Sequence, residues 1–231
     1  MDIETVYRNV PSFTKFYLAT FIINTCLISL ELVEFSDLEL DYEKAILGLE
    51  VWRFFTCFAF YNGFSILFVI IIVLSHVCLS TIEHYFRRRM QDFIFMIIFV
   101  WCCHLTLGWL LDTHHDMMAE FMCSFMYIYC RREREDRVEI FGVAIKARIF
   151  PWAWIVLCKI SGYRIIKIIA GYTIGHLYDY LKFIMPETLG YSLLETPRFL
   201  NWMVMKIEKR QPQQANEVDL VDHGDAGELA E

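Results

Sequence analysis

Residues 93–111 read FIFMIIFVWCCHLTLGWLL, nineteen consecutive positions without Asp, Glu, Lys or Arg. An α-helix needs about 20 predominantly apolar residues to cross a hydrocarbon core of about 30 Å. A soluble helix normally keeps a polar face, and this stretch has none. The stretch therefore predicts a membrane-spanning helix.

The composition of the whole chain agrees with a membrane protein. Of its 231 residues 57% are hydrophobic and 16% aromatic, with only 10 Gly and 5 Pro, and the mean hydropathy is +0.40. This composition favours a single helical membrane bundle over one or two soluble domains. The net charge is -7, and the acidic residues are concentrated at the two chain ends and in residues 31–50. We therefore expect no nucleic-acid partner.

Cysteine and histidine usage gives no sign of a metal or cofactor. The eight cysteines lie in apolar segments without a CxxC pair, so we interpret them as small hydrophobic residues. His114 and His115 share a short turn with two aspartates, but adjacent residues point apart and no HExxH-type spacing supports them. We predict no metal site and no cofactor, and we expect a hydrated turn there.

Apolar segments divide the chain into six predicted spans. They cover residues 16–30, 54–82, 93–111, 117–130, 149–163 and 168–185, the last ended by Pro186. The predicted organisation is an N-terminal segment over 1–15, a membrane domain over 16–186 and a polar tail over 187–231. The composition of the last twenty residues predicts disorder at the end of this tail.

Basic residues predict the orientation of the bundle. With an even number of spans both termini lie on one side, and that side holds sixteen of the 21 Lys and Arg residues. By the positive-inside rule, we expect both termini in the cytosol.

Three basic residues depart from this pattern. Lys159, Arg164 and Lys167 fall at the connection between the last two spans, on the side expected to be poor in positive charge. Only ten residues separate Arg148 from Lys159, which is about 15 Å of helix. We hypothesise that this half of the molecule thins the bilayer or lines a wet groove, with these three residues at its lining.

The last predicted span contains a packing signal. Residues 168–178 read IIAGYTIGHLY, and Gly171 and Gly175 are four positions apart. They lie on one helix face, where another backbone can approach closely.

Motifs along the chain resemble those of the derlins, the catalytically inactive branch of the rhomboid-like membrane proteins. Trp52-Arg53 resembles their WR signature, and Gly171-xxx-Gly175-His176 resembles the GxxxG motif of their sixth helix. Further similar positions are Pro11, Thr14, Lys15, Thr56, Phe58, Glu83, Gln91, Asp92, Phe93, Pro151, Trp152 and Tyr178. The resemblance covers roughly residues 8–190, with the motifs in order.

This resemblance implies a six-helix rhomboid-like bundle in the endoplasmic reticulum (ER) membrane with cytosolic termini. It implies a non-enzymatic role in ER-associated degradation, assisting retrotranslocation of misfolded proteins to the cytosol. The implied partners are misfolded substrates, a membrane ubiquitin ligase complex, membrane lipid and a cytosolic AAA+ ATPase. Some derlins bind that ATPase through a tail motif with phenylalanine, which residues 222–228 lack, so we expect indirect recruitment.

Two alternatives remain open, an intramembrane serine protease and a rhomboid-like trafficking chaperone. A rhomboid protease needs a serine in a GxSx turn at the fourth span and a histidine base in the sixth. Ser124 has no such glycine before it, and the base position is Ile168. His176 lies eight residues further on, about 12 Å along a helix. We therefore expect Ser124 to bond a helix carbonyl as a packing residue.

Arg53 is the basic residue for which we predict a specific role. We hypothesise that it anchors the segment 31–51 against the bundle and so fixes that segment at the membrane edge. Residues 87–89 and 131–137, which carry runs of arginine, are expected to be solvated cytosolic connections near anionic headgroups, without a site.

Overall fold

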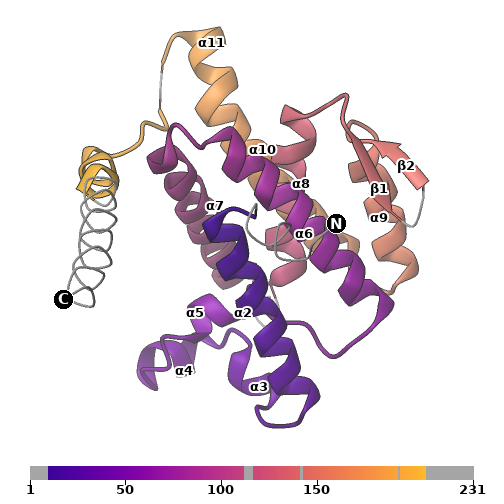
Figure 1. The fold of residues 1–231 in the computed structure, drawn as a ribbon. Coiled ribbons are helices and arrows are strands. Elements are labelled where there is room, and N and C mark those ends of the chain that lie inside the picture. Colours follow the sequence, from indigo (N-terminus) through magenta and orange to yellow (C-terminus); the bar gives the residue numbers. More distant parts are fainter. Residues whose placement is uncertain (1–9, 112–116, 141–142, 192, 207–231) are drawn as a thin grey trace, which may run out of the picture.

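The computed structural model is built almost entirely of helices (Figure 1), and it describes residues 10–111, 117–140, 143–191 and 193–206. The long helices are α2 Ser12–Ser29, α6 Ile66–Tyr85, α7 Met90–Leu111, α8 Met118–Arg132, α9 Phe150–Ile160 and α10 Ile165–Asp179. Each overlaps one predicted span. By length and hydropathy, α6 and α7 are the helices in the described residues that qualify as membrane spans, and α9 is a shorter apolar helix. The mostly helical fold is confirmed, and the six-span arrangement stays a prediction.

The second span begins later than predicted. We expected it from residue 54, but α5 Arg53–Thr56 ends after four residues and α6 starts at Ile66. Gly63 has a φ of +92°, which turns the chain, and the Ser65 hydroxyl caps α6 by accepting the Phe68 N–H at 3.2 Å. Hydropathy averaged over a window of residues does not reveal such a helix cap.

The acidic segment between α2 and α6 forms short helices at one end of the bundle (Figure 1). They are α3 Phe35–Leu38, α4 Tyr42–Leu47 and α5. The Asp41 carboxylate caps α4 by accepting the Lys44 N–H at 3.1 Å. This backbone hydrogen bond is the main reason that the pKa of Asp41 is lowered.

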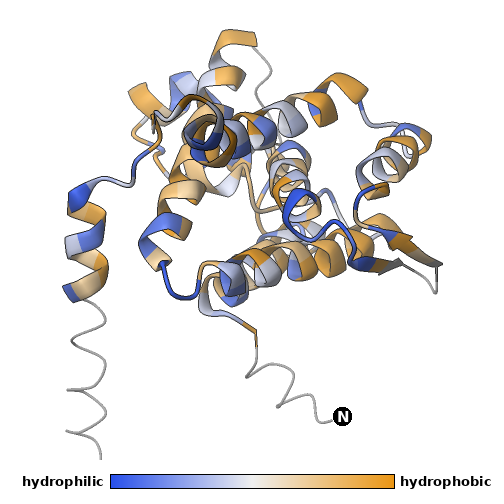
Figure 2. Ribbon diagram, turned by 90° about the horizontal axis from the view of Figure 1, so that it is seen from above, coloured by the Kyte–Doolittle hydropathy of each residue, from blue (hydrophilic) through white to orange (hydrophobic). Residues whose placement is uncertain are grey.

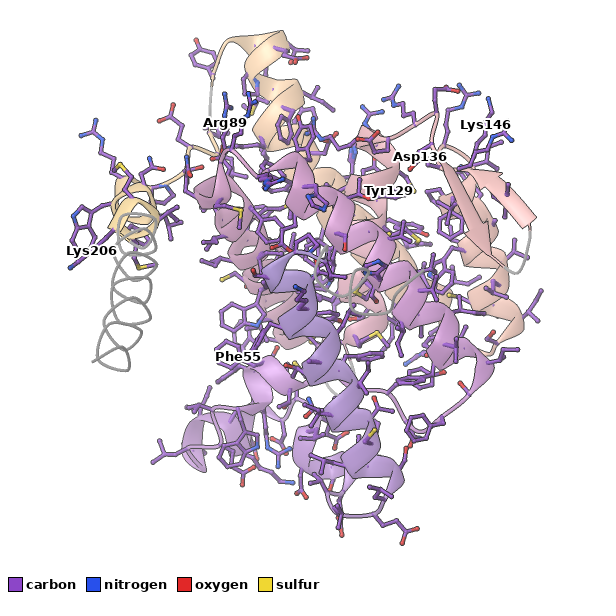
Figure 3. The ribbon with its side chains drawn as sticks, in the orientation of Figure 1. Phe55, Arg89, Tyr129, Asp136, Lys146 and Lys206 are labelled. Carbon is purple, nitrogen blue, oxygen red and sulfur yellow. The ribbon has the colours of Figure 1, made fainter. Side chains whose placement is uncertain are left out.

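A β-hairpin follows α8 and begins at the end of the stretch 131–137, which we predicted to be a solvated connection. Strands β1 Arg137–Ile140 and β2 Val143–Lys146 pair antiparallel, with Val138 opposite Ile145. The Tyr129 hydroxyl donates to the Asp136 carboxylate at 2.7 Å and ties the start of the hairpin to α8. Both residues are labelled in Figure 3. The sequence analysis did not predict this hairpin.

The last long helix also runs further than predicted. Pro186 does not end it: α10 continues through a π-helical turn, Tyr180–Ile184, into α11 Met185–Leu189. The Met185 N–H bonds the Tyr180 carbonyl, and this wider turn accommodates a proline, which has no N–H to offer. Gly190, with a φ of +70°, ends α11.

Helix α8 is the centre of the bundle. Eleven of its fifteen residues are buried, and α6, α7, α9 and α10 all pack against it. Hydrophobic positions also predominate along the outer faces of the long helices (Figure 2), and many large apolar side chains there are exposed. An apolar core with an apolar outside is what a bilayer environment predicts.

Candidate functional site

The glycine pair brings α10 into backbone contact with α8. A Cβ atom on Gly171 would lie 2.3 Å from the Glu120 carbonyl oxygen, and one on Gly175 would lie 2.6 Å from that of Ser124. Backbone atoms cannot move aside as a flexible side chain can, so both positions require glycine. This contact is the close approach that the GxxxG spacing indicates.

Ser124 lies at this contact and is fully buried. Its hydroxyl donates to the Gly171 carbonyl oxygen at 2.6 Å, while Oγ lies 3.5 Å from Nε2 of His104. The Nδ1 of His104 is 2.8 Å from the Val100 carbonyl, so in the neutral imidazole Nδ1 carries the proton and Nε2 is an acceptor. The serine proton is directed to a backbone oxygen instead of the imidazole. The bond to a helix carbonyl is the arrangement expected from the sequence, but the neighbouring His104 was not expected there.

A buried ion pair lies one helical turn from Ser124. The Lys167 ammonium is 3.3 Å from the Glu120 carboxylate, and their side chains are only 20% and 6% exposed. Buried charges are expensive to desolvate unless they are paired, so these two residues depend on each other. Sequence reasoning identified Lys167 but missed Glu120, although an acid within the apolar stretch 117–130 was a usable signal.

These polar groups line a groove between α7, α8 and α10. Its volume is about 680 Å³, within the range of ligand-binding clefts. His104, Glu120 and Lys167 contribute to it, and most of its remaining lining is apolar. Lys159 and Arg164 are exposed at the connection between α9 and α10 and do not line it. Of the three basic residues predicted to line a groove, the structure brings Lys167 into this one.

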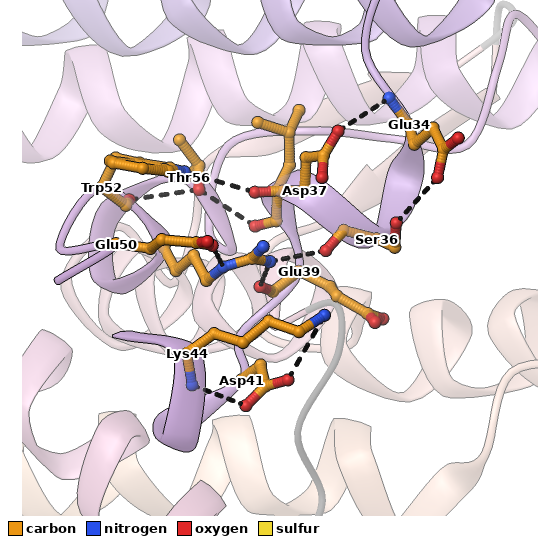
Figure 4. A network of polar contacts seen from close by, with 11 residues as sticks. Glu34, Ser36, Asp37, Glu39, Asp41, Lys44, Glu50, Trp52 and Thr56 are labelled. Atoms are coloured by element: carbon orange, nitrogen blue, oxygen red, sulfur yellow. Dashed lines mark hydrogen bonds and ion pairs between the residues drawn. The ribbon is translucent and has the colours of Figure 1, made fainter. Parts of the chain in front are cut away.

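Arg53 holds the segment before α5. Its side chain is 3% exposed, its Nε lies 2.5 Å from the Glu50 carboxylate, and one terminal nitrogen donates to the carbonyls of Ser36 and Glu39 (Figure 4). Two neighbours add bonds to the same segment. The Thr56 hydroxyl donates to the Leu38 carbonyl at 2.9 Å, and the Trp52 indole donates to the Asp37 carbonyl at 3.4 Å.

The opposite end of the bundle is tied by a second set of buried charges. The carboxylate of Asp179 on α10 bonds Arg131 at 3.2 Å and Arg132 at 2.9 Å, both at the end of α8. The expectation that these two arginines are simply solvated is wrong. Glu83 is also buried, and its carboxylate accepts the Phe13 and Thr14 N–H groups at 3.0 and 2.9 Å. Glu83, which lies on α6, thereby accepts hydrogen bonds from backbone N–H groups in the first turn of α2 that have no partner within that helix.

Within the described residues, no group of three or more His, Cys, Asp or Glu side chains could hold a metal ion. His114 and His115 lie outside the described residues.

Comparison with known proteins places these features in a family context. The family model described as the Der1-like family matches residues 10–198. The chain is 29% identical over 213 residues to Derlin-1.2 of Zea mays, covering 91% of this chain and 87% of that protein. It is 27% identical over 209 residues to Derlin-1 of Homo sapiens, covering 87% of this chain and 83% of that protein. The family match spans all the long helices from α2 to α10.

Proposed function

The chain belongs to the Der1-like family, and we propose that it is a non-enzymatic component of ER-associated degradation. In this role it assists the retrotranslocation of misfolded proteins from the ER lumen or membrane to the cytosol. The observation that carries the proposal is the groove between α7, α8 and α10. It combines apolar walls with the Glu120–Lys167 ion pair, one helical turn from Ser124.

The proposed topology is the six-span bundle of the sequence analysis, in the ER membrane with both termini in the cytosol. Residues 1–15 form the N-terminal segment, 16–186 the membrane domain and 187–231 the cytosolic tail. The short helix α9 supports a thinned bilayer: it has 11 residues, which correspond to about 16 Å of helix. This length falls short of a hydrocarbon core of about 30 Å.

The groove suits an unfolded polypeptide segment. Its apolar walls match hydrophobic side chains, while Glu120 and Lys167 offer an acceptor and a donor to backbone groups that have no partner in lipid. In the proposed topology this pair lies in the lumenal half of the bundle, because α8 begins and α10 begins on that side. The membrane ubiquitin ligase and the indirectly recruited AAA+ ATPase would then receive the segment at the cytosolic face.

The proximity of Ser124 and His104 favours one competing function, an intramembrane serine protease. A nucleophile needs a base that accepts its proton, and at 3.5 Å this contact is at the limit of a hydrogen bond. The shorter bond to Gly171 engages the proton, and Ile168 at the expected base position is fully buried and aliphatic. These contacts support the non-enzymatic role.

Two variants separate the two functions. We expect Glu120→Gln/Lys167→Met to slow the degradation of a misfolded lumenal glycoprotein in cells that lack their own derlins, since the groove loses its charges. Removing both charges avoids leaving one buried charge unpaired. Ser124→Ala should retain wild-type degradation, because it removes a single hydrogen bond worth about 1 kcal/mol.

The measurement is the half-life of the glycoprotein at matched expression of each variant. If the glycoprotein has its wild-type half-life in cells with the double variant, the groove plays no part in the proposed mechanism. Loss of degradation with Ser124→Ala, together with cleavage of a transmembrane reporter by the purified protein, would establish the protease instead.

A further inference from the structure

A second cavity opens between α8, α9 and α10, away from the groove that carries the proposed function. Its volume is about 640 Å³. Its lining is apolar in the interior, with Ile155 of α9 and Ile169 of α10 among the walls. The Tyr127 hydroxyl and Nδ1 of His176, which also line it, are hydrogen bonded to each other at 2.8 Å.

Three guanidinium groups contribute to one end of this cavity. They belong to Arg131 and Arg134, at and just beyond the end of α8, and to Arg148, just before α9. The Asp179 carboxylate bonds Nε of Arg131 at 3.2 Å, which fixes that side chain and leaves its terminal nitrogens for a ligand. Guanidinium groups bind phosphate through charge-assisted hydrogen bonds, so three of them lining one cavity form a site for a phosphate.

Two acidic residues of the same connection bond elsewhere. Asp136 accepts the Tyr129 hydroxyl at 2.7 Å, and Glu135 pairs with Lys146 at 3.3 Å. Neither lines the cavity. The positive charge is therefore available to a ligand from outside the chain.

The outer face of α9 beside the cavity is strongly apolar. Trp152 is 71% exposed, Val156 58% and Ile160 78%, all along one helix of eleven residues. In the proposed topology this face contacts the acyl chains of the bilayer. A molecule in the cavity would thus have its charged end at the arginines and its apolar end continuous with lipid.

We propose that this cavity binds one anionic glycerophospholipid of the cytosolic leaflet. Its phosphate contacts Arg131, Arg134 and Arg148, and an acyl chain lies between α9 and α10 against Ile155 and Ile169. The inference rests on the proposed function only for the membrane location and for the cytosolic position of the end of α8. An acidic peptide would match the arginines but would leave the apolar interior of the cavity without a partner.

The test is native mass spectrometry of the full chain, purified in a neutral detergent and equilibrated with equal amounts of phosphatidylserine and phosphatidylcholine. We expect one retained phosphatidylserine. Arg134→Gln/Arg148→Gln should weaken its retention about 30-fold, since each basic residue at a membrane surface contributes about fivefold. Arg131 is kept because it also bonds Asp179.

The matched control is Arg87→Gln/Arg88→Gln, which removes two exposed arginines from the connection between α6 and α7. This variant should retain phosphatidylserine like the unmodified chain. Soluble glycerophosphoserine, which has the headgroup but no acyl chains, should not displace the lipid.

Four results would overturn the proposal: equal retention of the two lipids, an equal loss with both double variants, displacement by glycerophosphoserine, or displacement by a hexaglutamate peptide. The readout needs no degradation substrate. A chain that retains the lipid but does not support degradation would therefore refute the proposed function alone.

Discussion

Arg53→Ala tests whether one buried guanidinium fixes the segment between α2 and α6. The substitution leaves the carbonyls of Ser36 and Glu39 without this donor and removes the partner of the Glu50 carboxylate. We expect α3 and α4 to open more often while the helices of the bundle stay folded. Membrane insertion should be normal, and clearance of misfolded substrates should fall.

The expected loss of stability follows from the groups that lose a hydrogen-bond or ion-pair partner. Removing one partner of a fully buried ion pair costs about 3–5 kcal/mol, and each buried acceptor left without a donor costs about 1–3 kcal/mol. The Glu50 side chain is 30% exposed, so water compensates part of its loss. A local destabilisation of about 3 kcal/mol is therefore reasonable, which corresponds to roughly 100-fold more frequent opening.

Hydrogen–deuterium exchange in detergent micelles measures this opening directly. Peptides that cover residues 35–47 should exchange roughly 100-fold faster in Arg53→Ala than in the unmodified chain. The control is Lys44→Ala in the same segment. Its side chain is 54% exposed and lies 3.7 Å from Asp41, so its loss should cost less than about 1 kcal/mol. Unchanged exchange in Arg53→Ala, or equal acceleration in both variants, would refute the anchoring role.

Two further predictions concern the helix contact and a helix cap. Gly175→Leu should prevent α10 from packing on α8, because even a Cβ atom would lie 2.6 Å from the Ser124 carbonyl oxygen; a monodisperse, fully active variant in size-exclusion and degradation assays would contradict this. The pKa of Asp41 in the folded chain is lower than its ordinary value of 3.8. The contribution of this cap to stability is therefore fully present above pH 3.8, and it is lost as the pH falls through the lowered pKa. The NMR shift of the Lys44 amide should therefore titrate with a midpoint below 3.8, and Asp41→Asn, which retains a cap, should abolish the titration.

The sequence located the helices well because each long apolar run forms one. The stretch 93–111 lies inside α7, Met90–Leu111, and the other five runs each overlap one helix. The errors occur where local chemistry interrupts hydropathy. Ser65 caps α6 inside an apolar run, and a π-helical turn carries the last helix past Pro186.

The hairpin was missed for a different reason. Val138, Ile140, Val143 and Ile145 alternate with other residues in the period-two pattern of strands, which was visible in the sequence. Charged residues on both sides of this short run favoured a solvated connection instead. The pairing of the two segments distinguishes a hairpin from a solvated connection, and Val138 is buried in the paired structure.

The site could be predicted only in part, because its pairs join distant positions. The spacing of Gly171 and Gly175 indicates a close contact but not which helix provides it. Lys167 is 47 positions from Glu120, and a single sequence contains no signal that the two meet. A charged residue within an apolar run indicates one member of a buried ion pair. The other member can be identified only from the folded structure.

The glycine contact also explains why Ser124 is a poor candidate for a nucleophile. Because Gly171 has no side chain, its carbonyl comes within 2.6 Å of the Ser124 hydroxyl and engages the proton. Moving α10 away from α8 would remove this acceptor, but it would also break the contact of Gly175 with the Ser124 backbone. The neighbouring imidazole of His104 belongs to α7 and directs its own proton to Val100. The residues that pack the two helices are thus the ones that keep the serine unreactive, and a mutation that activated the serine would be expected to weaken the bundle first.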